Sequence, residues 1–171
     1  MTTHLKKIYQ KIIIKKFINN TSSVLDIGSN DGTFLNFFKK TNTLFGVDPS
    51  SNKFRYLYKD HIKRINNFFS YKNVQKFFGK NKNQKFDLIS SIAMFYDVND
   101  PNKFCKDIFK LLKPNGIWIL ELSYFPLLLK NLTYDQICHE HVTYYTLNVF
   151  KKIAEKNDFK VIETEINEIN G

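Results

Sequence analysis

A short turn rich in glycine and acidic residues is the segment of this chain best suited to bind a ligand. It reads D-I-G-S-N-D-G over residues 26–32 and follows the apolar pair Val24 and Leu25. Two glycines four positions apart let the backbone approach a ligand that a Cβ would repel. We therefore expect a nucleoside-binding site at this turn, formed by Asp26, Gly28, Ser29, Asn30, Asp31 and Gly32.

A second acidic residue, Asp48, supports this expectation. It follows the next apolar run, residues 44–47, and stands twenty positions after Gly28. A carboxylate at this offset meets the ribose hydroxyls in nucleotide-binding βαβ units. The G-x-G-x-x-G pattern of dinucleotide sites is absent, so we predict an adenosine-type cofactor, with Pro49 among its binding residues. An incidental glycine turn in an ordinary α/β protein is the alternative, which Asp48 disfavours.

The other segment that could perform chemistry is Y-D-Q-I-C-H-E-H-V-T-Y-Y, residues 134–145. His139 and His141 flank Glu140, which concentrates groups able to move protons near neutral pH. These histidines and Cys138 could instead bind a metal, but structural zinc usually takes its ligands from two separated pairs and a second pair is absent. A polar cluster that only holds a loop is a further alternative. We favour acid/base catalysis, without a metal, because a cofactor pocket needs reactive groups nearby.

Alternating strand and helix patterns predict the elements that position these residues. They indicate an α/β fold, a doubly wound sheet with helices on both faces. The expected strands are residues 23–27, 44–48, 61–65, 86–90, 117–122 and 159–166, with a turn at 113–116. The expected helices are residues 32–40, 52–59, 71–78 and 147–156, and one that begins at Pro101.

Ligands of such sheets bind beyond the carboxyl ends of the strands, so the loops after the first, second, fourth and fifth strands should share one pocket. The loop after the fourth strand, residues 90–97, is rich in aromatic side chains. From this loop we expect Ser91 and Met94 to contact the cofactor. Ordinary packing is an equally good interpretation for Ile92 and Phe95.

Composition favours one globular domain. The chain has 171 residues, of which 43% are hydrophobic, enough for a substantial core. The formal net charge is +10, but of the 26 basic residues only Arg55 and Arg64 are arginine, and the lysines are spread along the chain. We interpret them as a solvated surface and expect no nucleic-acid partner.

The cysteines and the amino-terminal segment suggest a cytoplasmic protein. Cys105 and Cys138 are too few for a disulfide framework, which fits a reducing compartment. Lysines interrupt the apolar run at residues 12–14, so we expect neither a signal peptide nor a membrane-spanning helix. Residues 1–20 should form an amphipathic helix that leads into a domain over residues 21–171.

The turn D-x-G-x-x-x-G resembles motif I of the class I methyltransferases that use S-adenosyl-L-methionine. Over most of its length the chain resembles a narrower family, the C-methyltransferases of nucleotide-linked keto-sugars. The matching segments are V-L-D-I-G-S-N-D-G-T-F-L at 24–35, G-V-D-P-S at 46–50, L-L-K-P-N-G-I-W-I-L-E at 111–121 and, most diagnostic, residues 134–145. One branch matches best, through F-Y-D at 95–97, L-E-x-S-Y-x-P at 120–126 and N-x-x-N-G at 167–171.

The resemblance implies a Rossmann-like fold, S-adenosyl-L-methionine as cofactor and a nucleotide sugar as substrate. Carbon beside a carbonyl becomes nucleophilic only after it loses a proton, and His141 matches the proposed base of the family. Glu140 and His139 would orient the substrate or stabilise the enolate oxygen. Many members carry tyrosine at the position of Cys138, and Tyr144, Tyr124 or a water could replace it here.

The resemblance also bounds the acceptor and the length of the chain. The Asn/Asp-Pro-Pro-aromatic turn of many methyltransferases that modify nucleobase or protein amino groups is absent, which disfavours such an acceptor. Relatives continue beyond Asn-Gly into a seventh strand and a further domain, so we expect the sequence to be a fragment, truncated before the seventh strand. An O-methyltransferase and a non-catalytic cofactor-binding module are the alternatives. The sequence does not indicate an oligomeric state.

Overall fold

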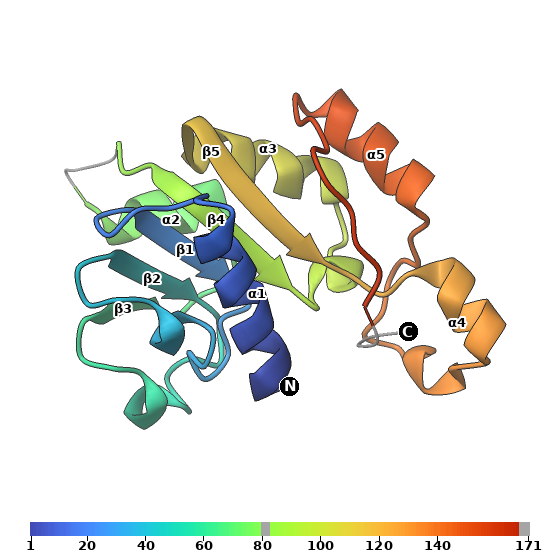
Figure 1. Ribbon diagram of the computed structural model, residues 1–171, viewed down its shortest axis with the longest axis horizontal. Helices are drawn as coiled ribbons and strands as arrows, with labels where there is room; N and C mark the ends of the chain where they lie inside the picture. Colours follow the sequence, from blue (N-terminus) through green and yellow to red (C-terminus); the bar gives the residue numbers. More distant parts are fainter. Residues whose placement is uncertain (80–82, 168–171) are drawn as a thin grey trace. The chain divides into compact units, whose positions relative to one another are not determined.

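The computed structural model describes residues 1–79 and 83–167 (Figure 1). The chain divides into two compact units. The first contains residues 1–91 and 110–119, and the second contains residues 92–109 and 120–171. None of the helices in the described ranges is long and apolar enough to cross a membrane.

A five-stranded parallel sheet forms the centre of the first unit, which confirms the predicted α/β fold class. Its strands are β1 Ser23–Ile27, β2 Thr43–Val47, β3 Ile62–Ile65, β4 Phe86–Ile92 and β5 Leu112–Glu121. Their order in the sheet is β3-β2-β1-β4-β5 (Figure 1). Because β1 lies between β2 and β4, the carboxyl ends of β1 and β2 are adjacent, as the sequence predicts. The last residues of β4 and β5 belong to the second unit.

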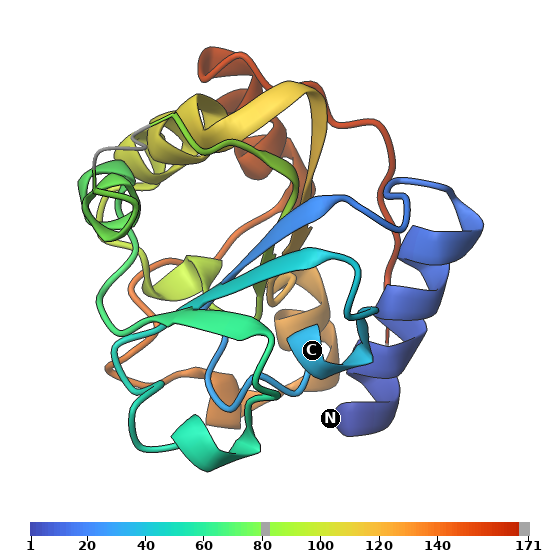
Figure 2. The same ribbon diagram turned by 90° about the vertical axis from the view of Figure 1, so that its left-hand side faces the viewer.

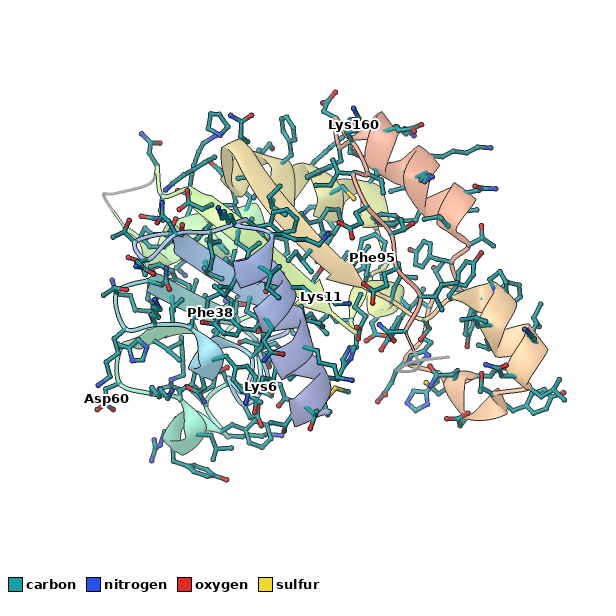
Figure 3. The ribbon with its side chains drawn as sticks, viewed as in Figure 1. Lys6, Lys11, Phe38, Asp60, Phe95 and Lys160 are labelled. Carbon is teal, nitrogen blue, oxygen red and sulfur yellow. The ribbon has the colours of Figure 1, made fainter. Side chains whose placement is uncertain are left out.

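The first unit is built around β1, in which every residue is buried. Strands of parallel sheets that are covered on both faces read as continuous apolar runs, and this explains the apolar pattern V-L-x-I at residues 24–27. Helices α1 (Thr2–Ile14) and α2 (Tyr71–Phe77) lie on opposite faces of the sheet (Figures 1 and 2). Tyr9 of α1 packs edge-on against Phe38, labelled in Figure 3, with ring centroids 5.0 Å apart.

The second unit has its own aromatic core. Its helical elements are the single-turn η3 (Phe95–Asp97), α3 (Pro101–Leu111, whose last two residues belong to the first unit), α4 (Phe125–Asn131), the single-turn η4 (Tyr134–Gln136) and α5 (Leu147–Lys156). Phe95, labelled in Figure 3, is fully buried. The ring centroids of Phe104, Tyr145 and Phe150 lie within 5.6 Å of its own. This core holds the segment that follows β4.

Two predicted helices are wrong. Residues 32–40 and 52–59 form only single 3₁₀ turns, η1 (Leu35–Phe37) and η2 (Arg55–Leu57). Each turn ends in an extended residue, Phe38 with ψ 155° and Tyr58 with ψ 135°. Asparagine and aromatic residues, frequent in both segments, have low helix propensity, which disfavours a longer helix. The first turn buries Leu35, whereas the second buries none of its residues.

Three further segments differ from the prediction. Residues 159–166 form no strand, because within the described ranges the sheet ends at β5 and a strand needs a ladder partner. Helix α1 ends at Ile14, before residue 20. Strand β5 begins at Leu112 and includes residues 113–116, which were expected to form a turn. Of the predicted N-x-x-N-G motif, residues 168–171 lie outside the described residues.

Candidate cofactor-binding and acid/base sites

The glycine loop, residues 28–32, leaves β1 with its backbone turned into the left-handed region. Gly28, Asn30 and Gly32 have φ values of 71°, 46° and 76°. The N–H of Gly32 donates to the carbonyl of Ser29 at 2.8 Å and closes the turn. Gly28 and Asn30 are exposed, whereas Asp26, Ser29 and Gly32 are buried. Gly28 and Asn30 are therefore the loop residues open to a ligand, although their N–H groups already donate to Val47 and Asp48.

Asp48 follows β2 and binds the loop directly. Its Oδ2 accepts a hydrogen bond from the N–H of Asn30 at 3.0 Å. Its Oδ1 accepts from the N–H and the hydroxyl of Ser50, at 2.6 and 2.5 Å. The structure thus joins Asp48 to the glycine loop, the two features that the sequence singled out. Oδ1 already accepts two hydrogen bonds and Oδ2 accepts one, so Oδ2 keeps a lone pair for a ligand hydroxyl, and the predicted ribose contact stays a prediction.

Asp26 is a fully buried carboxyl in β1, opposite Gly46 of β2 and Ser90 of β4. Burial raises its pKa from 3.8 to about 7; the Ser90 hydroxyl, which donates at 2.7 Å, opposes the rise, and the charge of Asp48 adds to it. A cation placed beside a carboxyl favours its ionised form and would lower this pKa.

Two predicted cofactor residues turn their side chains inward. The hydroxyl of Ser29 lies 2.9 Å from that of Tyr58, and Gly46 makes room for it, since a Cβ there would stand 2.5 Å from Ser29 Oγ. Ser91 is fully buried and accepts a hydrogen bond from Trp118 Nε1 at 2.9 Å. Their side chains therefore support the sheet and the loop.

The other three predicted cofactor residues differ in their surroundings. Asp31 Oδ1 accepts a hydrogen bond from the N–H of Thr33 at 2.9 Å, which stabilises the end of the loop. Pro49 is exposed beside Asp48. Met94 is half-buried and belongs to the second unit, where it precedes η3.

A cavity of about 420 Å³ lies at the other end of the sheet, where β1 and β4 begin. Ser22, Asp87 and Asn115 are among its lining residues. The Asp87 carboxylate is already engaged, because it accepts hydrogen bonds from Lys113 Nζ at 2.8 Å and from the N–H of Ser23 at 2.7 Å. The cavity is separate from the glycine loop, which follows the opposite ends of the strands.

In the second unit, His141 is held in one tautomer. Its Nδ1 lies 2.7 Å from the carbonyl oxygen of Gln136, and the hydroxyl of Tyr144 donates to the same oxygen at 3.1 Å. A carbonyl oxygen only accepts hydrogen bonds, so the neutral imidazole carries its proton on Nδ1. Nε2 then keeps a free lone pair, which is the arrangement that a general base needs.

The segment F-Y-D, residues 95–97, holds the histidine loop in place. The carbonyl of Tyr96 accepts hydrogen bonds from the N–H groups of Val142 and Thr143, at 3.0 and 3.1 Å. The Tyr96 ring packs against His141, with ring centroids 4.3 Å apart. Partial burial raises the pKa of Asp97; the His141 ring opposes this rise, and Glu140 adds to it. The carboxylates of Asp97 and Glu140 thus contribute to the electrostatic surroundings of the imidazole.

The neighbours of His141 are more open. His139 and Glu140 are exposed, whereas Cys138, His141 and Tyr144 are half-buried. The carbonyl of Cys138 accepts a hydrogen bond from the N–H of His141 at 3.2 Å. Among the described residues, no group of three or more histidine, cysteine and acidic side chains could hold a metal ion.

The sequence did not identify three residues that organise these sites. Gln136 lies inside the Y-D-Q-I-C-H-E-H segment and acts through its carbonyl, which no side-chain pattern reveals. Tyr96 belongs to the F-Y-D motif, but the motif does not indicate its role. Tyr58 comes from a segment expected to be helical and carries no motif of its own.

Solved structures similar to this chain are methyltransferases or share their fold. The YcgJ protein of Bacillus subtilis superimposes with a TM-score of 0.63 at 18% identity, over 86% of this chain and 66% of that one. The plantazolicin methyltransferase BpumL superimposes with a TM-score of 0.59 at 18% identity, over 79% and 55% of the two chains. At these identities the likeness concerns the fold, and it confirms the predicted Rossmann-like methyltransferase sheet.

Two sequence relatives are named for different reactions. The C-methyltransferase NovU of Streptomyces niveus is 23% identical over 98% of this chain and 40% of its own length. The tRNA U34 carboxymethyltransferase of Campylobacter jejuni is 28% identical over 88% of this chain and 54% of its own length. The chain thus spans about half of these relatives or less. The family model described as a methyltransferase domain matches residues 1–164. The chain therefore belongs to the methyltransferase domain family.

Proposed function

We propose that this chain is the cofactor-binding domain of an S-adenosyl-L-methionine-dependent C-methyltransferase that acts on a nucleotide-activated keto-sugar. The observation that carries the proposal is the fixed tautomer of His141, whose Nδ1 donates to the Gln136 carbonyl and whose Nε2 is left as a base. The similarity to NovU, a C-methyltransferase, supports the same reaction class. The lack of a disulfide framework among two cysteines favours a cytoplasmic location.

The residues around the glycine loop fit this cofactor. Gly28 and Asn30 are exposed at positive φ, so a ligand can approach without meeting a Cβ at Gly28. The buried Asp26 carboxyl would become ionised beside a cationic amine or sulfonium. Asp48 would accept a hydrogen bond from a ribose hydroxyl, Asp31, Gly32 and Pro49 would complete this part of the site, and Ser29 and Ser91 would support it from within the sheet. When bound, S-adenosyl-L-methionine supplies an electrophilic methyl group.

The base acts on the sugar. His141 Nε2 removes the proton from the carbon next to the keto group, so that a C–H bond breaks and an N–H bond forms. The electron pair moves onto the keto oxygen and gives an enolate, whose carbon is nucleophilic. The Gln136 carbonyl keeps the imidazole oriented, and it accepts a stronger hydrogen bond once the ring is cationic.

The neighbouring polar groups have supporting roles in this proposal. The carboxylates of Glu140 and Asp97 would stabilise the imidazolium, because each acts electrostatically in this cluster. Exposed His139 would contact the substrate or the enolate oxygen. Tyr144 shares the Gln136 carbonyl with His141, so its hydroxyl would fix the loop as the enolate forms.

Deuterium exchange tests the proposal without requiring complete turnover. The protein is incubated in D₂O with nucleotide-activated keto-sugars and no methyl donor, and exchange at the carbon beside the keto group is followed by NMR. We expect exchange with the natural sequence and none with His141→Gln. His4→Gln, on α1, is the matched control and should leave the exchange rate unchanged.

The outcomes separate the alternatives. Methyl transfer to the sugar without prior exchange would show an O-methyltransferase. Cofactor binding with neither exchange nor methyl transfer, tested on a panel of keto-sugars, would support a non-catalytic module. In both cases the C-methyltransferase proposal fails.

Modification of a tRNA base is a second candidate. It is favoured by the 28% identity to the Campylobacter tRNA U34 carboxymethyltransferases and by the formal charge of +10. Binding of unmodified tRNA at 150 mM salt discriminates it from the first, because a dispersed lysine surface gives only weak, steeply salt-dependent affinity. Specific tRNA binding at this salt concentration would replace the sugar with RNA as the proposed substrate.

A further inference from the structure

Tyr58 is a buried residue whose hydroxyl contacts the glycine loop. It follows η2 and is 7% exposed. Its hydroxyl donates to the carbonyl of Asn30 at 2.8 Å and lies 2.9 Å from the hydroxyl of Ser29. Because the single phenol proton goes to the carbonyl, Ser29 must donate to the phenol oxygen. Tyr58 therefore makes one hydrogen bond in each direction to adjacent loop residues.

Asn30 is consequently held through both of its backbone polar groups. Asp48 accepts from its N–H at 3.0 Å, and Tyr58 donates to its carbonyl at 2.8 Å. Asn30 has a φ of 46°, a conformation that costs free energy for a residue with a side chain. The two contacts, from opposite ends of the residue, stabilise this conformation and with it the exposed part of the loop.

The Tyr58 ring also explains one of the loop glycines. A Cβ on Gly32 would lie 2.7 Å from the Cδ1 and Cε1 atoms of the ring, closer than atoms can approach. Gly32 thus makes room for Tyr58, independently of any ligand. The ring is supported in turn by Arg64 of β3, whose guanidinium carbon lies 5.7 Å from the ring centroid. Arg64 Nη1 donates to the carbonyl of Ser51 at 3.1 Å and stays in place.

The phenol is suited to a permanent donor role. Burial raises the pKa of Tyr58 to about 12, the hydrogen bond from Ser29 opposes this rise, and the charges of Asp26, Asp48 and Asp31 add to it. The hydroxyl therefore keeps its proton throughout the physiological range of pH.

We propose that Tyr58 is a positioning residue for the cofactor, which holds Asn30 and Ser29 so that the exposed residues of the loop, Gly28 and Asn30, are in the arrangement that binds S-adenosyl-L-methionine. The inference rests on the proposed function of the loop. It explains the second glycine of the motif, Gly32, by the space that the Tyr58 ring needs. It attributes the cofactor affinity of the loop to the Tyr58 hydroxyl. Tyr58 itself does not touch the cofactor in this proposal.

Tyr58→Phe tests the inference, because it removes both hydrogen bonds and keeps the ring beside Gly32 and Arg64. Affinity for S-adenosyl-L-methionine and S-adenosylhomocysteine is measured by calorimetry at a temperature where thermal denaturation shows each variant fully folded. We expect the Kd to rise about tenfold, the loss of one to two neutral hydrogen bonds. Tyr56→Phe, at a side chain that is 76% exposed, is the matched control and should leave the Kd unchanged.

The outcomes are distinct. If the natural sequence binds neither ligand, the proposed function fails. If it binds and folded Tyr58→Phe has a Kd within twofold, the positioning role is wrong, even where the melting temperature falls. Should Tyr58→Phe not fold, Ser29→Ala takes its place, since it removes one donor to the phenol and leaves the bond to Asn30. For Ser29→Ala, a threefold or larger rise in Kd supports the inference, and an unchanged Kd overturns it.

Discussion

Asp48 accepts a hydrogen bond from the backbone N–H of Asn30 at 3.0 Å, and this joins the loop after β2 to the glycine loop after β1. The contact follows from the register, in which Ile27 pairs with Val47 at the ends of the two strands. A carboxylate in this place has two tasks, since it organises the loop and remains available to a ligand. Substitution of Asp48 tests both tasks together.

Asp48→Ala should weaken the binding of S-adenosyl-L-methionine by about 1.5–3 kcal/mol, the value of a hydrogen bond to a charged group. Asp48→Asn keeps one acceptor oxygen for the N–H groups of Asn30 and Ser50, so it should also lose affinity, through the loop contacts and the charge together. Calorimetry of both variants is the measurement, with exposed Asp60→Ala as control. Unchanged affinity in Asp48→Ala would refute the predicted contact.

Gly32→Ala should destabilise the fold more than Gly79→Ala, although both glycines have positive φ, 76° and 57°. A Cβ at Gly79 meets nothing within 4 Å, so only the backbone strain of about 1 kcal/mol applies. At Gly32 the Cβ also collides with the Tyr58 ring, which adds about 1–3 kcal/mol of overpacking. Urea denaturation measures both. Equal losses would mean that Tyr58 moves aside without cost.

The sequence predicted the strands well because β1 and β4 are buried runs bounded by recognisable turns. It placed Asp26 and Asp48 correctly at the ends of neighbouring strands, since parallel order follows from the alternation of strands and helices. It failed at residues 32–40 and 52–59, where apolar spacing suits a helix but the chain makes a single turn and then extends at Phe38 and Tyr58. Apolar spacing alone does not fix the length of a helix.

The organisation of the candidate sites was only partly predictable. The types of His141 and Glu140 suggested acid/base chemistry, but the partner of His141 is the main-chain carbonyl of Gln136, and only the folded loop brings it within 2.7 Å. Tyr58 reaches the glycine loop from 28 residues further along the chain than Asn30. Such contacts depend on the path of the backbone, which residue types do not specify. The predicted strand at 159–166 failed because strand pairing requires a neighbour as well as a pattern.

Asp26 should make the stability of the fold depend on pH. Its pKa is about 7 in the folded chain against a usual 3.8, so between these pH values the folded state holds a proton that the unfolded state lacks. The stabilisation from this group is fully present below about pH 4 and is lost as the pH rises through 7, with a magnitude of a few kcal/mol. Asp26→Asn should remove this dependence. The measurement is the free energy of unfolding in urea at pH 5 and at pH 7.5.

Comparing Asp26→Asn with the natural sequence cancels the contributions of other carboxyls to the pH dependence. Exposed Asp60→Asn serves as control and should keep the pH dependence of the natural sequence. If Asp26→Asn loses stability between pH 5 and 7.5 as steeply as the natural sequence does, the buried carboxyl titrates at its ordinary pKa and the cation-binding role proposed for it loses its basis.

His141→Gln should abolish methyl transfer to a keto-sugar, by about 10²–10⁴-fold, and leave cofactor affinity near normal. Glutamine can still donate to the Gln136 carbonyl, so the loop keeps its main contact while the base at Nε2 disappears. His139→Gln is the informative comparison, because His139 is the exposed neighbour in the same H-E-H segment and glutamine keeps a donor for the substrate or the enolate oxygen, so the loss should be smaller than with His141→Gln. Initial rates and calorimetry give the two quantities. If His139→Gln is inactive and His141→Gln is active, the base is the other histidine and the tautomer fixed by Gln136 serves only to hold the loop.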